Sequence, residues 1–512
     1  MVNQVAMLLA DGYKHVHSEQ YPKGLTKLVS YLTPRKSRLK YQDHMILFGL
    51  QAFLKTYLID YFNKYFFNLP EEEVITEYQR IIDSMLGAGN YDIEKIRKLH
   101  QLGYLPLEFC ALPEGTKVPM GVPCIQITNT HPDFAWLVQW VESLLSSEIW
   151  KPCVHANVGY EYRKIVNKYY ALSVDEDFPR SKAMSDFGFR GMSCLQEAIK
   201  ASSSWLLSFS GTATIPAVRY LEENYNCNNT AEPFASNVIS TEHSVMASNY
   251  AVDGDEVTFI KRLLTEIYPN ASFSMVSDTY DLFNLIDDLL PQCWDEIMKH
   301  NGKLIIRPDS GDIVDIAVQT VEHLYKLFPG KWNSKGYKTL DPHIGVVYGD
   351  GVTIERAERI YGRLTDRGFA ANVITFGAGS FSFNAIEEEG VLKPFTRDTF
   401  SIAVKATYGE VNGHPIFIYK NPKTDTDHFK KSQKGMCVVY YDYEGFNIPA
   451  PGKEVITYQD EFISKTIDNA SYLSSGRIGP NLLQPIFRDS KMLKEYTLQE
   501  TRDRIHSSEG GF

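Results

Sequence analysis

Four short apolar segments that each run into a turn with aspartate or glycine decide the fold: FSMVSD (273–278), LIIRPDSG (304–311), IGVVYGDG (344–351) and VITFGAG (373–379). Each has the length of a buried strand, and a helical pattern follows at least the first three. This alternation is typical of β/α units in a parallel sheet or barrel, where ligands bind at the carboxyl ends of the strands. Carboxylates and bare backbone amides on one rim suit a sugar phosphate with a divalent cation.

The composition is that of a globular protein with no general affinity for nucleic acid. The 512 residues are 44% hydrophobic and 22% charged, and their length suggests two or three domains. A net charge of −11 leaves no basic footprint for nucleic acid, so any anion site must be local. Seven scattered cysteines without a CxxC pair favour a reducing compartment over a disulfide framework or a thiolate zinc site.

No segment reads as a leader or a membrane span. The first 14 residues are too short and too weakly apolar for a signal peptide. Residues 45–67 are the most apolar long run, but polar residues interrupt them and the apolar ones recur at helical spacing, as in a core helix. We therefore expect a cytoplasmic protein without a membrane partner, in the host cytoplasm if the chain is viral.

The periodicities divide the chain into two parts. Residues 1–150 look α+β, and the strand-rich tail, 400–512, is predicted to fold back onto them as one discontinuous domain. Residues 151–399 are predicted to form an irregular, TIM-like α/β barrel. The predicted helices cover 44–66, 71–87, 134–150, 158–171, 192–208, 255–267, 280–290, 312–328 and 353–367. Further strands are predicted at the two ends of 107–127, around a Pro-Glu-Gly turn, and at 400–408, 414–420 and 436–443.

The RPDSGD turn (307–312) places an arginine at the end of an otherwise apolar strand. A purely structural interpretation, with a proline turn and Asp309 or Ser310 capping a helix, explains the polar residues. It does not explain Arg307, whose guanidinium at such a place needs an anionic or carbonyl ligand unless it meets a carboxylate. We favour the ligand-binding interpretation.

The other strand-end turns exclude two nucleotide-binding motifs. Asp350 in YGDG lies between two glycines that let a ligand approach the backbone, although Asp-Gly is also a common turn. GAGS (377–380) lacks the third glycine of GxGxxG, and no Gly-Lys-Ser/Thr follows, so dinucleotide and P-loop binding fail on spacing. Asp278 falls at a strand terminus, while Asp281 suits the dipole at the start of the next helix.

Two further motifs carry groups that recognise rings and phosphates. In SDFGFRG (185–191), Phe187 or Phe189 could stack on a planar ring or simply pack in the core, and Arg190 could hold phosphate. In STEHS (240–244), Ser240 or Thr241 is the expected helix cap and His243 falls in the first turn. A histidine there is structural, a general acid–base or a phosphoryl acceptor.

Taken together and in this order, these segments resemble the nicotinamide phosphoribosyltransferase family of type II phosphoribosyltransferases. The resemblance covers nearly the whole chain, since it begins at DGYKHVHSEQYP (11–22) and ends in the lysine-rich stretch 420–434. Between them it includes SYLTPRK (30–36), LPEGTKVPMG (112–121), SGTAT (210–214), FTRD (395–398) and the strand-end motifs quoted above. It implies transfer of phosphoribose from phosphoribosyl pyrophosphate to nicotinamide, giving nicotinamide mononucleotide and pyrophosphate in NAD biosynthesis. It also implies Mg²⁺, ATP coupling through a phosphohistidine, and a homodimer with shared sites.

Carried over position by position, the resemblance also implies roles for individual residues. The catalytic residues would be His243, as the phosphorylated histidine, with Asp278, Asp309 and Asp350. The substrate-binding residues would be Asp11, Tyr13, Phe187, Arg190, Ala213, Ser274, Arg307, Pro308, Gly349, Gly379 and Ser380. The pyridine ring would lie between Phe187 and Tyr13 of the partner subunit. The partner would also supply positive charge through Arg35, Arg397, Lys405, Lys420 and Lys430. Mg²⁺ would be held through substrate phosphates and waters.

Three positions depart from the family pattern. Ala213 stands where an aspartate is usual, so an acceptor for the nicotinamide NH₂ group is lost, while Asp11 remains. Ser380 replaces a glycine, and Asn237 replaces a small hydroxyl residue. The alternatives are therefore a nicotinate phosphoribosyltransferase or a non-catalytic binding protein on the same scaffold.

Overall fold

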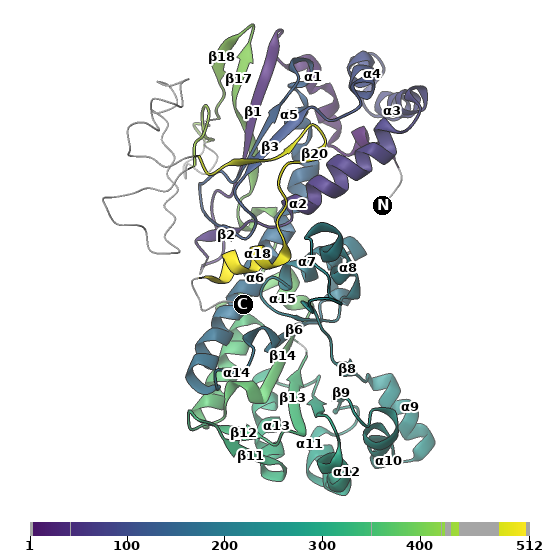
Figure 1. The fold of residues 1–512 in the computed structure, drawn as a ribbon, viewed down its shortest axis with the longest axis vertical. Helices are drawn as coiled ribbons and strands as arrows, with labels where there is room; N and C mark the ends of the chain where they lie inside the picture. The colour runs from purple at the N-terminus through teal and green to yellow at the C-terminus, as the bar shows by residue number, and fades with distance from the viewer. Residues whose placement is uncertain are drawn as a thin grey trace, which may run out of the picture. The chain divides into compact units, whose positions relative to one another are not determined.

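The computed structural model describes residues 4–40, 42–349, 351–420, 422–424, 432–439 and 481–507 (Figure 1). The chain divides into two compact units. The first joins Met1–Val154, Glu223–Asn226 and Thr396–Gly511, and the second joins His155–Glu222 and Cys227–Phe395. In the part of the chain described, no helix has both the length and the apolar character needed to cross a membrane.

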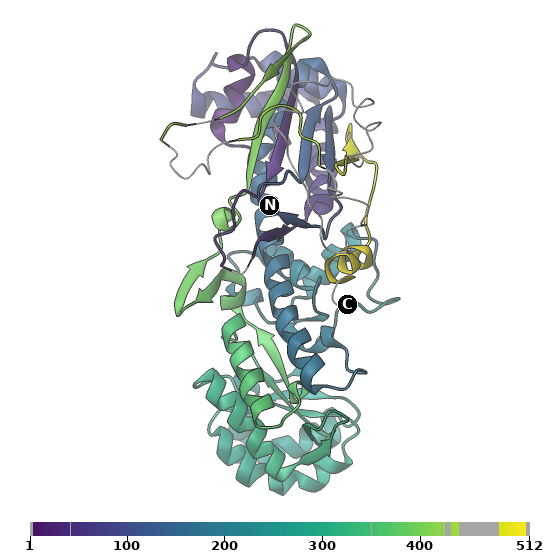
Figure 2. The same cartoon turned by 90° about the vertical axis from the view of Figure 1, so that its left-hand side faces the viewer.

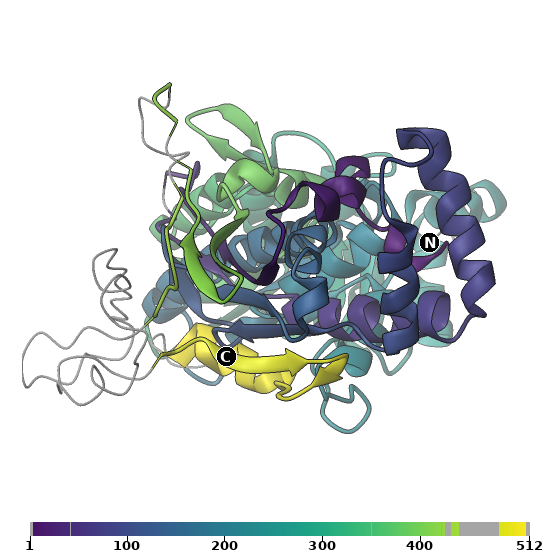
Figure 3. The same ribbon diagram turned by 90° about the horizontal axis from the view of Figure 1, so that it is seen from above.

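The first unit is built on a seven-stranded sheet with the order β18-β17-β1-β5-β3-β19-β20. Neighbouring strands are antiparallel, and β1 pairs with β17 so that Tyr31 faces Lys405. Strands from the C-terminal part of the chain form both edges, so segments far apart in the sequence lie side by side (Figures 1 and 3). The strands are β1 (Leu25–Thr33), β3 (Leu107–Ala111), β5 (Ile125–Asn129), β17 (Ala403–Val411), β18 (His414–Phe417), β19 (Gln484–Arg488) and β20 (Lys491–Met492).

One predicted helix of the first unit begins later in the structure than the sequence predicts. Residues 44–46 form β2 (His44–Ile46), which pairs with β4 (Lys117–Pro119), so the predicted helix 44–66 starts only at Leu50. The helical elements are η1 (Ala6–Leu8), η2 (Gly12–Val16), α1 (His17–Gln20), α2 (Leu50–Phe53), η3 (Leu54–Tyr61), η4 (Asn63–Phe67), α3 (Glu71–Leu86), α4 (Ile93–Leu102), η5 (Pro132–Phe134), α5 (Leu137–Trp140), η12 (Arg397–Thr399) and α18 (Leu498–His506).

A single long helix replaces two predicted ones. α6 (Glu142–Ser173) runs through Pro152 and includes both the end of the predicted helix 134–150 and the whole of 158–171. A proline normally interrupts a helix because it removes one backbone donor. Here Cys153, Val154 and Ala156, directly after the proline, are fully buried. Packing therefore outweighs the local preference.

The second unit contains a seven-stranded sheet in which every paired neighbour is parallel, with the order β7-β6-β14-β13-β10-β9-β8. The four segments that predicted the fold are β9 (Phe273–Val276), β10 (Leu304–Arg307), β13 (Ile344–Tyr348) and β14 (Ile374–Ala378), which are adjacent in the sheet. The prediction of β/α units is confirmed. A parallel bridge between Gly211 of β7 and Ser236, just before β8, links the two edges and curls the sheet towards a barrel.

Helices lie against the outside of this sheet (Figure 2). The remaining strands of the unit are β6 (Met184–Asp186), β7 (Gly211–Thr212), β8 (Ile239–Ser240), β11 (Pro329–Trp332), β12 (Lys338–Leu340), β15 (Ala385–Glu388) and β16 (Val391–Pro394). The helices are α7 (Leu195–Trp205), α8 (Ile215–Asn224), α9 (His243–Asp253), α10 (Val257–Arg262), α11 (Leu282–Asn284), α12 (Trp294–Lys299), α13 (Ile313–Leu327), α14 (Ile354–Asp366) and α15 (Ser380–Asn384). The other helical segments are η6 (Arg180–Lys182), η7 (Phe189–Gly191), η8 (Leu263–Ile267), η9 (Leu285–Leu289), η10 (Leu290–Cys293) and η11 (Ala371–Val373).

Small side chains inside the curled sheet leave room for a cavity. Gly345, Thr375, Ser185 and Gly211 line it from four different strands. Barrels of this kind are usually filled by bulky branched residues. Here a cavity of about 470 Å³ is left instead.

Candidate functional site

Two carboxylates and a histidine meet at the carboxyl ends of β9 and β10. Asp278 follows β9, and its Oδ2 accepts hydrogen bonds from the Asp309 amide at 2.8 Å and the Ser310 hydroxyl at 2.6 Å. His243 Nε2 lies 4.0 Å from Asp278 Oδ1 and 3.8 Å from Asp309 Oδ2. Asp278 is nearly buried, and its Oδ1 has no hydrogen-bond partner within the described residues. A buried carboxylate oxygen in this state has spare capacity for a water, a cation or a substrate hydroxyl.

His243 is the first residue of α9 and its side chain is half-exposed. Its Nδ1 lies 3.1 Å from the Thr279 hydroxyl, which leaves Nε2 on the side of the two carboxylates. The predicted cap is wrong, because Glu242 precedes the helix, Ser240 belongs to β8, and the Thr241 hydroxyl accepts from the Val276 amide. The first-turn position of His243, beside unpaired helix amides, favours an anion next to the ring.

Arg307 is the last residue of β10, and only part of its guanidinium group is hydrogen-bonded within the described structure. Its Nη2 donates to the Thr241 carbonyl at 2.8 Å, while its buried Nε has no partner among the described residues. Burial lowers the pKa of Arg307, and the nearby Asp309 and Asp278 act in the opposite direction. A guanidinium stays protonated in this setting, so the unpartnered Nε is suited to an anionic or carbonyl ligand, and the ligand-binding role of Arg307 stays a prediction.

The Asp309 carboxylate in the RPDSGD turn does not cap the helix that follows. The predicted cap by Asp309 or Ser310 is wrong, because α13 begins at Ile313 and Asp312 accepts from the Asp315 amide. The carboxylate of Asp309 is 39% exposed on the rim. Pro308, between Arg307 and Asp309, is buried. Asp281 is itself a cap, accepting from two amides at the start of α11.

Phe187 forms a platform at the end of β6. Its amide donates to the Ala378 carbonyl at 2.8 Å, and its ring lies against Gly377 of β14 and Gly349, which follows β13. A Cβ added to Gly377 would come within 2.2 Å of the ring, and one added to Gly349 within 3.1 Å. The glycines of FGAGS and YGDG therefore make room for this ring. Asp350, which follows Gly349, lies outside the described residues.

The sequence reasoning missed the residue that organises this end of the sheet. The carboxylate of Asp186 is fully buried and accepts from the Gly188 amide at 2.7 Å and from the hydroxyls of Thr212 at 2.8 Å and Thr214 at 3.1 Å. Burial raises its pKa, while these hydrogen bonds act in the opposite direction. Asp186 thus joins SDFGFRG to SGTAT and holds exposed Ala213 beside them. An acid directly before the aromatic platform was the signal in the sequence.

The remaining predicted rim residues pack around the same loop. Gly379 precedes α15, which begins at Ser380. A Cβ added to Gly191 would lie 1.8 Å from the Ser380 hydroxyl, so these two segments are in close contact. Arg190 is exposed in η7 and lies near enough to Arg307 to oppose protonation of that guanidinium. Ser274 is buried in β9, and its hydroxyl has no partner within the part of the chain described.

The residues predicted to act from a partner subunit belong to the first unit. Tyr13 is 56% exposed, and burial of its hydroxyl together with Asp11 and Glu142 raises its pKa. Glu142 binds the ammonium groups of Lys14 at 2.6 Å and Lys405 at 2.9 Å. The Asp11 carboxylate accepts from the Ser143 hydroxyl at 2.5 Å.

Three other predicted cations also occur here. Arg397 Nη1 donates to the Ile402 carbonyl at 2.8 Å, and the Arg35 amide donates to the Phe400 carbonyl at 3.1 Å. Lys420 is exposed, and its amide donates to Ser432. Lys430 lies outside the described residues.

The donor set suits a cation held largely through water. The described residues contain no group of three or more histidines, cysteines or acids able to hold a metal by themselves. Asp278 and Asp309 nevertheless present oxygen ligands, one of them unpartnered. Mg²⁺ prefers oxygen ligands and keeps several waters, so these residues fit it as partners of a phosphate-bound ion.

Comparison with known proteins places the chain in a family. A model of the nicotinate phosphoribosyltransferase (NAPRTase) family matches residues 182–467, and a model of the nicotinamide phosphoribosyltransferase N-terminal domain matches residues 5–66. A nicotinamide phosphoribosyltransferase of Acinetobacter baylyi is 35% identical over 463 residues, covering 86% of this chain and 88% of that protein. One of Xanthomonas campestris is 29% identical over 507 residues, covering 97% of each.

The fold is also found in solved structures. Human nicotinic acid phosphoribosyltransferase aligns with a TM-score of 0.58 at 14% identity, covering 98% of this chain and 94% of that one. Nicotinate-nucleotide pyrophosphorylase from Pyrococcus furiosus aligns with a TM-score of 0.56 at 15% identity, covering 98% and 95%. At such identities the likeness concerns the fold alone. The match to the family model and the 35% identical relative show the family as well: the chain belongs to the nicotinamide phosphoribosyltransferases, enzymes of the nicotinate phosphoribosyltransferase family.

Proposed function

We propose that this protein transfers the 5-phosphoribosyl group of phosphoribosyl pyrophosphate to nicotinamide, giving nicotinamide mononucleotide and pyrophosphate for NAD biosynthesis. The observation that carries the proposal is the cluster of His243, Asp278 and Asp309 within 4.0 Å at the strand ends. Phe187 directly follows β6 of the same parallel sheet, and two glycines leave space for its ring. One rim thus offers a surface for a pyridine ring and acids for a ribose.

The chemistry requires charge stabilisation on both sides of the bond that breaks. When pyrophosphate leaves C1, positive charge grows on the ribose ring, and the nearby carboxylates of Asp278 and Asp309 stabilise it. Arg307 and Arg190 carry the charge to bind phosphate oxygens. Mg²⁺, held by Asp309 and Asp278 through waters, would neutralise the leaving pyrophosphate.

ATP is proposed to act through His243. The Nε2 atom would attack the γ-phosphorus of ATP, the bond to the β-phosphate oxygen would break, and ADP would leave. The Thr279 hydroxyl orients the ring through Nδ1. The helix amides of α9 would stabilise the phosphoryl group.

The enzyme is proposed to be a cytoplasmic homodimer with shared sites. Tyr13 of the partner subunit would cover the ring on Phe187, and exposed cations of the first unit would reach the phosphates. Seven scattered cysteines without a CxxC pair fit a reducing cytoplasm.

Nicotinate is the second candidate base, and Ala213 is the observation that favours it. The exposed methyl group of Ala213 neither accepts from an amide nor repels a carboxylate. Asp11 would still disfavour nicotinate if it faces the same end of the ring, so we place nicotinamide first.

The deciding experiment measures turnover with each base at fixed phosphoribosyl pyrophosphate, with and without Mg²⁺ and ATP. We expect nicotinamide mononucleotide to form only with Mg²⁺, and faster with ATP. Faster turnover of nicotinate would assign the second function. If a folded dimer turns over neither base, the protein is a non-catalytic binding protein on this scaffold.

A further inference from the structure

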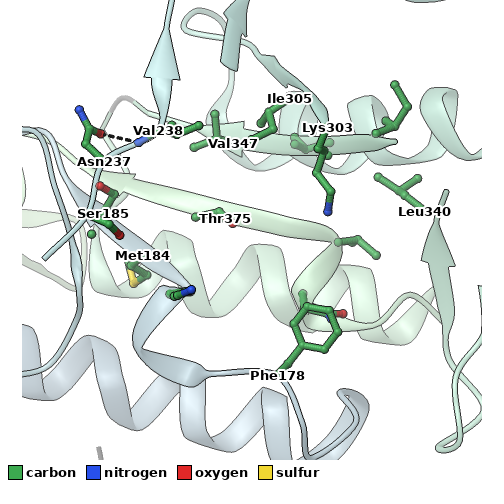
Figure 4. Close-up of a pocket in the computed structure, with 18 of the residues that line it drawn as sticks. Phe178, Met184, Ser185, Asn237, Val238, Lys303, Ile305, Leu340, Val347 and Thr375 are labelled. Carbon is green, nitrogen blue, oxygen red and sulfur yellow. Dashed lines mark hydrogen bonds between the residues drawn. The ribbon is translucent and has the colours of Figure 1, made fainter. Parts of the chain in front are cut away.

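Two neighbouring strands of the curled sheet each continue into a turn at its rim. Val347 of β13 and Thr375 of β14 line the cavity inside the sheet (Figure 4). After β13 the chain passes through Gly349 and Val352, and after β14 it passes through Gly379 into α15. Because β13 and β14 are parallel neighbours, both turns lie at the same edge of the sheet.

A buried tyrosine of α6 joins these two turns. The Tyr162 hydroxyl lies 2.8 Å from the Val352 carbonyl oxygen and 2.8 Å from the hydroxyl of Ser382 in α15. The Ser382 hydroxyl lies 3.1 Å from the same carbonyl oxygen. All three residues are buried, and burial raises the pKa of the Tyr162 phenol, so this hydroxyl keeps the proton that it donates. Two hydroxyls from separate elements therefore share one carbonyl oxygen.

The same helix holds α15 at a second point. His155 Nε2 donates to the Phe383 carbonyl at 2.7 Å, and the two rings meet edge-on with centroids 5.2 Å apart. His155 and Tyr162 are seven residues apart, or about two turns, so they lie on the same side of α6. Both belong to the second unit together with the turns that they contact. Adjacent residues of α15, Ser382 and Phe383, are thus fixed by one long helix.

The turn after β13 lies directly beside groups assigned to the substrates. A Cβ added to Gly349 would be 3.8 Å from Oδ1 of Asp309 and 3.1 Å from the Phe187 ring. One added to Gly377 of β14 would lie 2.9 Å from the Cα of Gly349. A shift of either turn would therefore change the space beside Asp309. Binding sites need supporting groups that hold such segments to within about 0.5 Å.

We propose that Tyr162 is a positioning residue for phosphoribosyl pyrophosphate. One hydroxyl would be enough to satisfy the buried Val352 carbonyl, but Tyr162 and Ser382 together fix the turn after β13 to both α6 and α15. This holds Gly349 beside Asp309, where the proposed function places the phosphoribosyl group. The inference rests on that proposed function, and it adds a residue that acts on the substrate through other residues.

The test is Tyr162→Phe, which removes one oxygen atom and keeps the ring. Binding of phosphoribosyl pyrophosphate with Mg²⁺ is measured by calorimetry, and KM for each substrate by steady-state kinetics. We expect phosphoribosyl pyrophosphate to bind about tenfold more weakly, the effect of losing one hydrogen bond. The KM for nicotinamide should stay nearly unchanged, because the Phe187 amide is held separately by the Ala378 carbonyl.

Matched variants separate positioning from the mere loss of a buried hydroxyl. Tyr361→Phe makes the same change at a fully buried tyrosine of α14 whose hydroxyl has no partner among the described residues, and it should bind both substrates normally. Ser382→Ala should weaken phosphoribosyl pyrophosphate binding, and the double variant with Tyr162→Phe should lose less than the two losses combined, because both hydroxyls act on one carbonyl. Its control is Ser203→Ala, at a buried serine of α7 that also has no hydroxyl partner in the described part of the chain.

Unchanged binding of phosphoribosyl pyrophosphate by folded Tyr162→Phe and Ser382→Ala would overturn the inference and leave these residues a structural role. Equal losses for nicotinamide and phosphoribosyl pyrophosphate would also overturn it, as would the same loss in Tyr361→Phe. If Tyr162→Phe does not fold, Ser382→Ala decides the question. A wild type that does not bind phosphoribosyl pyrophosphate would overturn the proposed function as well, whereas binding without transfer would contradict the proposed function alone.

Discussion

At the residue scale, the site depends on acids that are held in place by other groups. The Asp309 amide and the Ser310 hydroxyl hold Asp278, and donors that include the Gly188 amide and the Thr212 and Thr214 hydroxyls hold Asp186. Asp309 has the more exposed carboxylate of the rim pair and makes no cap. Asp186 therefore holds two segments together, whereas Asp309 and the unpartnered Oδ1 of Asp278 are available to a substrate.

Replacing Asp309 by alanine should lower kcat/KM by about 100-fold, the usual cost of removing a group that stabilises transition-state charge. The thermal midpoint should stay near that of the wild type, because a half-exposed carboxylate contributes little packing. Asp288→Ala, an exposed acid on η9, is the control. Near-normal turnover of Asp309→Ala would contradict the catalytic assignment.

The alanine at position 213 leads to a prediction about selectivity between nicotinamide and nicotinate. One charge-assisted hydrogen bond contributes about 1.5–3 kcal/mol, so its loss lowers discrimination by about one to two decades. We expect the wild type to prefer nicotinamide modestly, and Ala213→Asp to sharpen that preference, mainly by worsening nicotinate. The ratio of kcat/KM for the two bases is the measurement. An unchanged ratio would mean that another residue, with Asn237 and Ser274 first in line, discriminates between the bases.

At the scale of single elements, the start of α9 is predicted to determine how ATP stimulates turnover. His243→Ala should keep basal transfer and lose ATP stimulation, because the phosphoryl acceptor is removed and the acids of β9 and β10 remain. The readout is the ratio of rates with and without ATP, together with phosphohistidine by mass spectrometry. Stimulation as strong as in the wild type would rule out His243 as the acceptor.

The start of α2 carries a pH-sensitive group. Glu114 is fully buried and accepts from the Gln51 amide at 2.6 Å. Burial raises its pKa to about 7, while hydrogen bonds from the first amides of the helix act in the opposite direction. The unfolded chain releases this proton near pH 4.3. The folded state therefore binds more protons between about pH 4.3 and 7, and stability from this group falls as the pH rises through that window.

Glu114→Gln should remove that dependence. The two proteins should have similar unfolding free energies at pH 5, where the native glutamate is neutral. The variant should be the more stable at pH 8, by up to ~3 kcal/mol. Thermal midpoints at pH 5, 6, 7 and 8 test this, and a constant difference across the series would disprove it.

At the scale of the whole molecule, shared sites predict complementation between subunits. Tyr13→Ala and Arg190→Ala should each be inactive alone, because each damages both sites of a homodimer. In randomly mixed dimers half are hybrids with one intact site, so about a quarter of wild-type activity should return. Mixing two differently tagged Tyr13→Ala chains is the control. No recovery in verified hybrids would place each site within one chain.

Much of the second unit followed from its sequence, because its strands are buried and continuous. Runs such as LIIR and IGVVY need no tertiary information to be recognised, and the aspartates and glycines after them mark the rim where the ligand site is predicted. The cluster at this rim was foreseen, since carboxyl ends of neighbouring parallel strands must meet. The residues that precede the helices were not foreseen, because serine, threonine, aspartate and glutamate compete locally for a few amides. Asp312 precedes α13 where Asp309 or Ser310 was expected, and Glu242 precedes α9 where Ser240 or Thr241 was expected.

The sequence by itself determined the parallel sheet and the residue types gathered at the carboxyl ends of its strands, since these depend on periodicity and on turns between neighbouring residues. Only the tertiary structure decided three features. α6 continues through Pro152 because buried neighbours outweigh one lost hydrogen bond. Asp186 joins two loops 26 residues apart in sequence. The cavity inside the curled sheet exists because small residues from separate strands, such as Ser185, Gly211 and Gly345, line it. These features depend on which distant residues become neighbours, and local sequence patterns carry no information about that.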